Sequence, residues 1–367
     1  MSKLSKSLFL AAVALQPLIW SQPTMRGVPL ASLTQPRVPG DPLELVTGEA
    51  ESVQTVEQRA AAVNLVKRAL ASSLIREHPP YHLQTTLTVS GPASPETWTM
   101  EDMAPERGLY RWTVQGPSLS MVNVYTGGIL YSTEPSGGLP LRLVQIREAV
   151  LYHREPIGAH TALRTAPGWL NGAELACVLL SQRAEAKPPD IGRRWEEAEY
   201  CVDPRTNLLM TWSPAPGVYV AYDYSTSLHL NGVTVAGAFR ITQAGHTVVE
   251  GRTVNLPGAE SLDPALFDPT GLNQVGVGSI MQVTSRLSQF LPNTGPRSAL
   301  HVVIVHGVLE PNQRLSEAEV VASTSEVLNR TALDSAARVK RRSTEQSGAT
   351  PQTREVFVTV QIAVPAE

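Results

Sequence analysis

The sequence predicts an α+β protein: an antiparallel sheet curled around one long helix, followed by a small ββαβ module. The helix is predicted over Glu51–His78, where apolar residues recur at helical spacing until Pro79–Pro80 end the pattern. Short β-branched and aromatic runs separated by turn residues then continue to residue 255. Many short strands after one helix favour a meander that wraps the helix. The apolar stripe expected to pack on the sheet consists of Val56, Val63, Val66, Leu70 and Leu74.

Turn residues separate the predicted strands, for example at Gly116–Pro117, Gly127–Gly128, Asp203–Pro204 and Gly245–His246. A segment around Leu139–Val150 is either a second short helix or a covering loop. The strands are expected at Tyr81–Ser90, Thr97–Asp102, Leu109–Val114, Ser118–Tyr125, Ile129–Ser132, Glu174–Ser181, Trp195–Val202, Leu208–Trp212, Val218–Tyr224, Val233–Thr242 and Thr247–Val254.

A strand, a tight turn, a second strand, a helix and a third strand are predicted in the C-terminal part of the chain. The first and last strands, Leu300–Glu310 and Arg354–Val364, are β-branched and apolar. A break at Pro311–Asn312–Gln313 precedes the second strand, Arg314–Thr324, and the helix at Glu326–Arg342 has apolar residues at helical spacing. A helix that crosses one face of three strands makes a compact ββαβ module.

Four strings of this module share a known pattern: VVIVHGVLEPNQRLSEAEVVASTS, LNRTAL at Leu328–Leu333, ARVKRR and REVFVTVQI. On them the module resembles the C-terminal domain of TonB, the periplasmic end of a machine that energises outer-membrane transporters. Asn312–Gln313 replace the usual Gly of the turn, and Arg341–Arg342–Ser343 stand where an aromatic residue normally follows the helix. The resemblance implies a module that engages an envelope protein. The alternative is a ββαβ module with another purpose.

A TonB transducer also needs a membrane helix and a long Pro-rich spacer. The 29 prolines of this chain are scattered rather than arrayed in a polyproline spacer. The pattern therefore favours a binding module over a part of the motor.

The closing strand of the module is the candidate partner-binding element. Terminal strands often lie at a sheet edge, where unpaired backbone groups can accept a further strand from a partner. The alternative is that Arg354 and Glu355 only protect this edge from aggregation. The candidate partner-binding residues are Val356, Phe357, Val358, Thr359 and Val360.

The N-terminus predicts secretion. Lys3 and Lys6 precede an apolar run of 13 residues, Leu8–Trp20, and a polar exit, which is typical of a secretory signal peptide. Thirteen helical residues rise ~20 Å, less than the ~30 Å hydrocarbon core, so a permanent transmembrane anchor is disfavoured. We expect cleavage near Ser21 and a periplasmic mature chain that starts near Gln22. The alternative is an N-terminal helix that stays on the protein.

Three strings of the middle region share the residue pattern of strands in a known half-barrel: YHLQTTLTV, ERGLYRWTV and NVYTGGILYSTEP. On them the region resembles the periplasmic lipoprotein-carrier superfamily of LolA and LolB. The resemblance implies a half-barrel whose concave apolar face holds an acyl chain, although related half-barrels also sense proteins. The candidate lining residues are Leu109, Trp112, Leu130 and Trp212, and the alternative is that they simply fill a core.

The two cysteines are the most specific local feature of the middle region. Cys177 and Cys201 lie on predicted strands joined by a polar loop, so they could face each other across a hairpin. In an oxidising compartment this pattern indicates one structural disulfide, and the alternative is two buried free thiols. Their spacing fits neither a CxxC redox site nor a metal cluster.

Motifs for chemistry are missing from the sequence. It contains no HExxH, G-x-S-x-G or phosphate-binding P-loop pattern, and Gly276–Val277–Gly278 lacks the third Gly of a dinucleotide fingerprint. His301 and His306 are five residues apart on a strand, which places them on opposite faces, so we expect strand filler. A net charge of −3 gives no electrostatic case for nucleic acid. We expect no enzyme, no cofactor and no metal site.

These patterns divide the chain into a signal peptide (1–21), a flexible leader (22–50), the half-barrel domain (51–255), a linker (256–298) with a short helix at Ser279–Phe290, and the TonB-like module (299–367). The predicted function is non-catalytic binding in the periplasm, in which the C-terminal module engages an envelope protein linked to outer-membrane transport. An alternative is a carrier of lipid or lipoprotein cargo, with the module serving to dock it. A third is an unrecognised hydrolase.

Overall fold

The structure is a computed structural model in which residues 46–47, 50–90, 94–117, 119–133, 141–151, 157–181, 197–277, 300–312, 314–323, 325–338 and 354–363 are described. All of these belong to one compact unit, Ser32–Glu367. The predicted signal peptide, and the predicted helix at Ser279–Phe290, lie outside the described residues. Among the described helices, none is long and apolar enough to cross a membrane.

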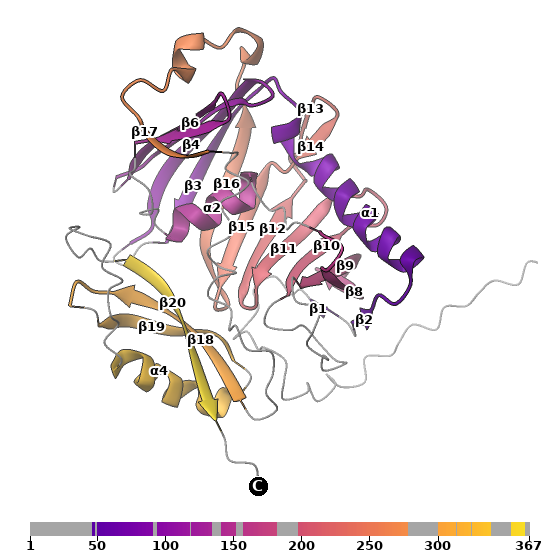
Figure 1. Ribbon diagram of the computed structural model, residues 1–367, viewed down its shortest axis with the longest axis vertical. Coiled ribbons are helices and arrows are strands. Elements are labelled where there is room, and N and C mark those ends of the chain that lie inside the picture. The colour runs from indigo at the N-terminus through magenta and orange to yellow at the C-terminus, as the bar shows by residue number, and fades with distance from the viewer. Residues whose placement is uncertain are drawn as a thin grey trace, which may run out of the picture. The chain divides into compact units, whose positions relative to one another are not determined.

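One 15-stranded antiparallel sheet dominates the fold (Figure 1). The sheet consists of an early group of strands, β3 to β7, and a later group, β8 to β16. The two groups join at the centre of the sheet, where β16 pairs with β3. In spatial order the strands are β1 (Val46–Thr47), β8 (Ala162–Leu170), β9 (Ala173–Ser181), β10 (Ala198–Val202), β11 (Leu209–Ala215), β12 (Val218–Asp223), β15 (Ala238–Gln243), β16 (His246–Asn255), β3 (Tyr81–Val89), β4 (Glu96–Glu106), β5 (Leu109–Gln115), β6 (Ser120–Thr126), β7 (Ile129–Ser132) and β17 (Asn273–Val277); β2 (Glu51–Ser52) pairs with β8.

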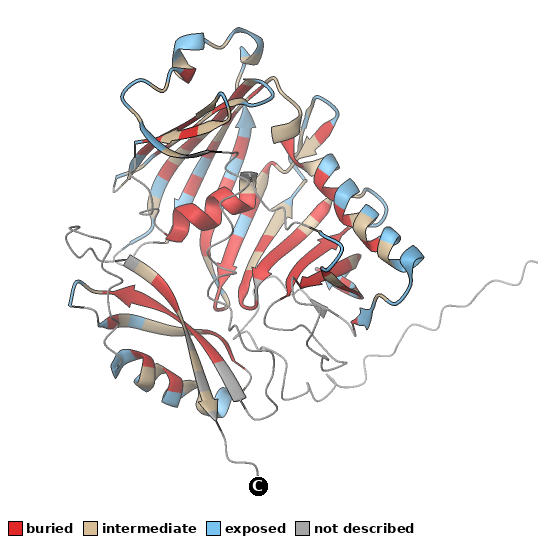
Figure 2. Ribbon diagram, in the orientation of Figure 1, coloured by how far each residue is buried: buried red, intermediate tan, exposed pale blue. Residues whose placement is uncertain are grey.

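Two helices cover one face of this sheet. Helix α1 (Val56–Ser73) begins at a capping box in which the Thr55 side chain accepts from Gln58 N while the Gln58 side chain accepts from Thr55 N. Helix α2 (Leu141–Leu151) packs against β15 and β16. Buried residues of both helices share one apolar cluster with the strands. Figure 2 shows the difference between them: α1 has an exposed side, whereas α2 is buried along its length.

A short hairpin, β13 (Leu228–Leu230) and β14 (Val233–Val235), packs beside the end of α1. Its turn, Asn231–Gly232, has positive φ at both residues, as a tight two-residue hairpin requires. The Asn231 amide nitrogen donates to the carbonyl oxygens of His78 and Pro80, at 2.7 Å each, and so fixes the hairpin to the segment that leaves α1.

The C-terminal part forms a three-stranded sheet in the order β19 (Leu315–Ser323), β18 (Leu300–Leu309), β20 (Arg354–Ala363). Helix α4 (Asn329–Arg338) follows a 3₁₀ turn at Glu326–Leu328 and covers one face of it. We call β18, β19, α4 and β20 the C-terminal module.

The described strands depart from the predicted ones in several places. Strands β1, β2 and β13 were not predicted, and β1 lies in the segment predicted to be a flexible leader. The run predicted as one strand, Val233–Thr242, forms β14 and β15 with a break at Ala236–Gly237. Strand β8 was not predicted, because Pro167 and Gly168 weaken its strand pattern. Strand β17 adds to β7 at the sheet edge, inside the segment predicted to be a linker. Of the two alternatives at Leu139–Val150, the structure has the helix.

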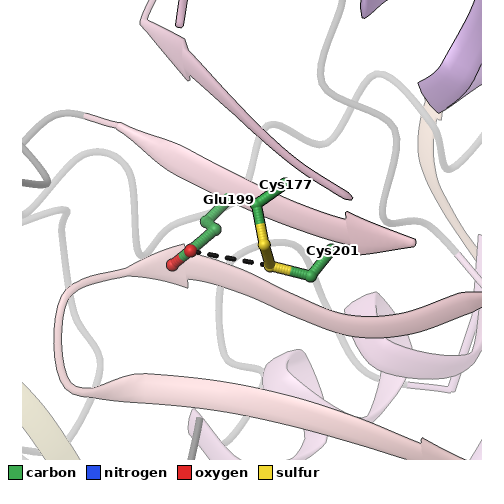
Figure 3. Close-up of a disulfide and its surroundings, with 3 residues drawn as sticks. All are labelled: Cys177, Glu199 and Cys201. Carbon is green, nitrogen blue, oxygen red and sulfur yellow. Dashed lines mark hydrogen bonds between the residues drawn. A yellow bond between two sulfur atoms is a disulfide. The ribbon is translucent and has the colours of Figure 1, made fainter. Parts of the chain in front are cut away.

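A disulfide joins Cys177 of β9 to Cys201 of β10, which stand directly opposite each other in the sheet (Figure 3). It confirms the predicted pair. The Glu199 carboxylate lies 3.6 Å from the Cys201 sulfur, a contact without a donor because the oxidised sulfur has no hydrogen. These three side chains are close enough to surround a metal ion, but a disulfide offers no thiolate to bind one.

Gly168 lies against this disulfide. A Cβ added at Gly168 would stand 2.5 Å from the Cys177 sulfur, which is covalently fixed and buried. We expect Gly168→Ala to lower the free energy of unfolding by about 1–3 kcal/mol through overpacking. Urea unfolding of the full chain measures this difference.

The matched background is Cys177→Ala with Cys201→Ala, which removes both sulfurs and costs about 3 kcal/mol by itself in the chain-entropy model. In that background Gly168→Ala should cost much less, since the clashing atom is gone. An equal cost in both backgrounds would show that the clash is not the cause.

Candidate functional site

A small cavity of about 40 Å³ lies under the C-terminal ends of both helices. Ser73 and Leu74 close it from the α1 side, and Ala149 and Val150 close it from the α2 side. Its floor is formed by β3, β11, β12, β15 and β16, and the hairpin segment Val235–Ala236 also lines it. The cavity therefore lies on the helix-covered face of the large sheet, beside the ends of α1 and α2 and the hairpin.

The wall of this cavity is apolar and neutral. Its hydroxyl groups are mostly occupied, since Tyr222 Oη donates to Ala149 O at 2.8 Å and Tyr224 Oη donates to Leu209 O at 2.9 Å. Burial raises the pKa of Tyr222 well above its ordinary value of 10 and raises the pKa of Tyr224 to about 12. Both phenols stay protonated at physiological pH, so the wall presents no charge. Such a wall suits an apolar ligand.

The cavity is small in this structure. Its volume of about 40 Å³ has room for a few water molecules at most, whereas a ligand pocket measures roughly 300 Å³ or more. An acyl chain would fit only after one of the surrounding elements moved. Tyr222 ties the last turn of α2 to β12, so movement of α2 would open the cavity at that end.

Helix α2 is unusual because it buries polar side chains as well as apolar ones. Arg142, Gln145, Arg147 and Glu148 are each less than a tenth exposed. Burying such groups is costly unless they are paired. Arg142 Nη1 donates to Gln145 Oε1 at 2.9 Å and to Gln243 Oε1 at 3.0 Å. Its Nη2 lies 3.3 Å from a carboxylate oxygen of Glu355 on β20.

Glu355 belongs to a continuous set of contacts between the C-terminal module and the large sheet. His306 bridges two carboxylates, with Nδ1 2.9 Å from Glu319 and Nε2 3.1 Å from Glu355. Glu319 also contacts Gln243 Nε2 at 3.1 Å and His246 Nε2 at 2.6 Å. We call this set the polar network; it consists of Arg142, Gln145, Gln243, His246, His306, Glu319 and Glu355.

The polar network favours ionised partners. Burial raises the pKa of Glu319, but hydrogen bonds from His306, His246 and Gln243 outweigh it and bring the pKa to about 2. The pKa of Glu355 is likewise lowered against burial by His306 and Arg142. Burial lowers the pKa of His306, yet its two carboxylate partners produce a net rise. His306 was predicted to be strand filler, and its role in this network was not visible from its spacing.

The four predicted lining residues do not line the cavity. Trp112 and Trp212 are buried in the main apolar cluster under the helices. Leu130 packs in a separate cluster with Tyr81 and Tyr110, and half-buried Leu109 packs beside another around Phe267. The structure therefore spreads these four residues over three clusters.

The predicted partner-binding strand lies at an edge: among the described strands, β20 pairs with β18 alone. Its side chains are largely occupied. Val356, Val358 and Val360 pack toward α4, and Phe357 is 3% exposed in the main cluster with Ile304 and Val321. The side chain of Thr359 lies outside the described residues. The other backbone edge of β20 is not paired with any described strand.

Comparison with known proteins finds solved structures that are partly similar to this chain. No protein-family model and no curated protein matches the chain. A LolA superfamily protein from Nitrosomonas europaea is similar at 8% identity and a TM-score of 0.35, over 56% of this chain and 97% of that one. A DUF1329 family protein from Desulfovibrio piger is similar at 8% identity and a TM-score of 0.37, over 58% of this chain and 98% of that one. A putative outer membrane lipoprotein-sorting protein domain from Vibrio parahaemolyticus is similar at 7% identity and a TM-score of 0.36, over 57% of this chain and 97% of that one. With TM-scores below 0.5, these similarities carry no functional argument.

The polar network predicts a pH dependence of stability. The raised pKa of His306 gives a stabilisation that is complete below its unfolded value of 6.5 and is lost as pH rises through the folded value. The lowered pKa of Glu319 gives a second stabilisation, which is complete above the unfolded pKa of 4.5 and is lost as pH falls toward the folded pKa of about 2. Urea unfolding should therefore show the network's contribution at its highest between pH 4.5 and 6.5, with a decline on the alkaline side.

His306→Gln tests the alkaline limb, because glutamine can still donate to one carboxylate but does not titrate. The groups that face His306 are Glu319, Glu355 and the cation of Arg142. In the variant the decline above pH 6.5 should flatten. An unchanged alkaline slope would show that another group titrates there.

Proposed function

We propose that this chain is a non-catalytic binding protein of the cell envelope that takes an acyl chain on the helix-covered face of its large sheet. The observation that carries the proposal is the neutral apolar cavity between the ends of α1 and α2 and the hairpin. A lipid or lipoprotein acyl chain is also the ligand implied by the resemblance in YHLQTTLTV and ERGLYRWTV.

The chemistry of the wall selects against polar ligands. The wall has a hydrocarbon surface formed by Leu74, Ile75, Leu83 and Phe239. The hydroxyl groups of the two tyrosines already donate hydrogen bonds to backbone carbonyl oxygens. A charged ligand would find no opposite charge there, while each methylene buried contributes about 0.8 kcal/mol. With secretion by the predicted signal peptide, such a site would serve to carry an acyl chain through the periplasm.

Ala236→Phe tests the site directly, because Ala236 lines the cavity and a phenyl ring is larger than the space available. Titration of the full chain with the fluorescent fatty acid 11-(dansylamino)undecanoic acid should show saturable binding. The variant should bind at least about tenfold more weakly.

The matched control is Ala265→Phe, which makes the same substitution at an exposed position outside the cavity. It should bind the probe like the natural sequence. Equal affinity of both variants would place the probe elsewhere, and absence of saturable binding in the natural sequence would refute the acyl-chain proposal.

A second candidate function is recognition of an envelope protein by the C-terminal module, as its TonB-like pattern implies. The edge position of β20 favours it, since a partner's extended segment could add to this edge by backbone pairing. The two functions are compatible: cargo held on the large sheet, and docking through the module.

Val358→Pro and Val358→Ala separate backbone recognition from side-chain recognition. Proline removes the N–H and distorts the strand, whereas alanine keeps the N–H and shortens the same side chain. Envelope proteins captured by the natural sequence should be retained by Val358→Ala and lost by Val358→Pro. Recovery of the same partners by the proline variant would end the edge-strand hypothesis.

A further inference from the structure

The C-terminal module packs closely on the large sheet and on α2. Ile304, Val321 and Phe357 of the module are less than a twentieth exposed and share the main apolar cluster with α2. Gly217, in the turn between β11 and β12, approaches the module so closely that an added Cβ would collide with the backbone oxygen and side chain of Val321. This close approach indicates a built interface within the chain.

Helix α2 has neighbours on both sides of this interface. It packs against β15 and β16 of the large sheet and against β20 of the module. Arg142, in its first turn, donates to Gln243 of the sheet and pairs with Glu355 of the module. Among the described residues, Glu355 is the carboxylate that pairs with this buried cation.

We propose that the docked C-terminal module is a latch that holds α2 over the cavity. If the module left, Arg142 would lose its carboxylate partner, and α2 would lose the apolar cover that Ile304, Val321 and Phe357 give to the cluster it shares with them. Apolar residues of α2 would then face water, which weakens the packing that holds this helix on the sheet. Undocking of the module therefore favours release of α2.

The latch controls access to the cavity, because Ala149 and Val150 at the other end of the same helix form part of its wall. This consequence for ligand uptake rests on the proposed function, whereas the contact between the module and α2 is independent of it. A partner that pulls on the module would, by the same geometry, open the cavity from a distance.

Hydrogen–deuterium exchange of the α2 amides, measured without any ligand, tests the latch. Glu355→Gln removes the charge that faces Arg142, and its matched control is Glu250→Gln, which removes a carboxylate from an exposed pair with Arg240 on the sheet. We expect exchange in residues 141–151 to rise at least about tenfold in Glu355→Gln, with β3 and β16 unchanged. Glu250→Gln should leave α2 unchanged.

A second pair of variants loosens the module without touching the polar network. Gly217→Ala places a methyl group against Val321, whereas Gly172→Ala introduces the same positive-φ strain with nothing within 4 Å. Faster α2 exchange in Gly217→Ala but not in Gly172→Ala supports the latch. Unchanged α2 exchange in both Glu355→Gln and Gly217→Ala overturns it.

Association of 11-(dansylamino)undecanoic acid then separates the latch from the proposed function. A faster association rate in Glu355→Gln and Gly217→Ala supports control of access by the latch, and an unchanged rate despite faster α2 exchange overturns that control. If the natural sequence does not bind the probe while α2 exchange still responds to both variants, the proposed function fails and the latch stands.

Discussion

The buried guanidinium of Arg142 is the constraint on which the arrangement of this protein depends. A buried cation must have partners, and its partners come from three elements: its own helix, the large sheet and the C-terminal module. Each of these elements could pack on hydrocarbon alone. The cation requires them to meet at one point, and in this way sets where α2 lies on the sheet and where the module lies on α2.

Much of the fold could be predicted because its elements follow local rules. The turns at Gly127–Gly128 and Asp203–Pro204 and the paired cysteines carry their signal within a few residues. The predicted α1 stripe is buried at Val66, Leu70 and Leu74, but Val56 is 79% exposed because the first turn of the helix extends beyond the sheet contacts. Strand β8 was missed because Pro167 and Gly168 mimic a turn. Only the structure shows why glycine is needed at 168: the disulfide occupies the place of a side chain.

The candidate site was beyond prediction because distant segments assemble it. Ala149, Tyr222 and Ala236 come from a helix, a strand and the end of a hairpin, and no periodicity connects them. The predicted lining residues were chosen as apolar strand positions, and apolar character alone does not tell a core residue from a residue of a pocket wall. His306 and Phe357 show the same limit, since the covering of their sheet face depends on α2 and β12, far away in sequence.

The seam between β16 and β3 has a consequence for how the chain is made. Val249 of β16 pairs with Val89 of β3. The edge of β3 is therefore covered only after the later strands of the large sheet have formed. Contacts of such high sequence separation slow folding and leave strand edges open in the meantime. A chain made from its N-terminus leaves the edge of β3 open until the residues of β16 have been synthesised, and aggregation at that edge competes with folding in the interval.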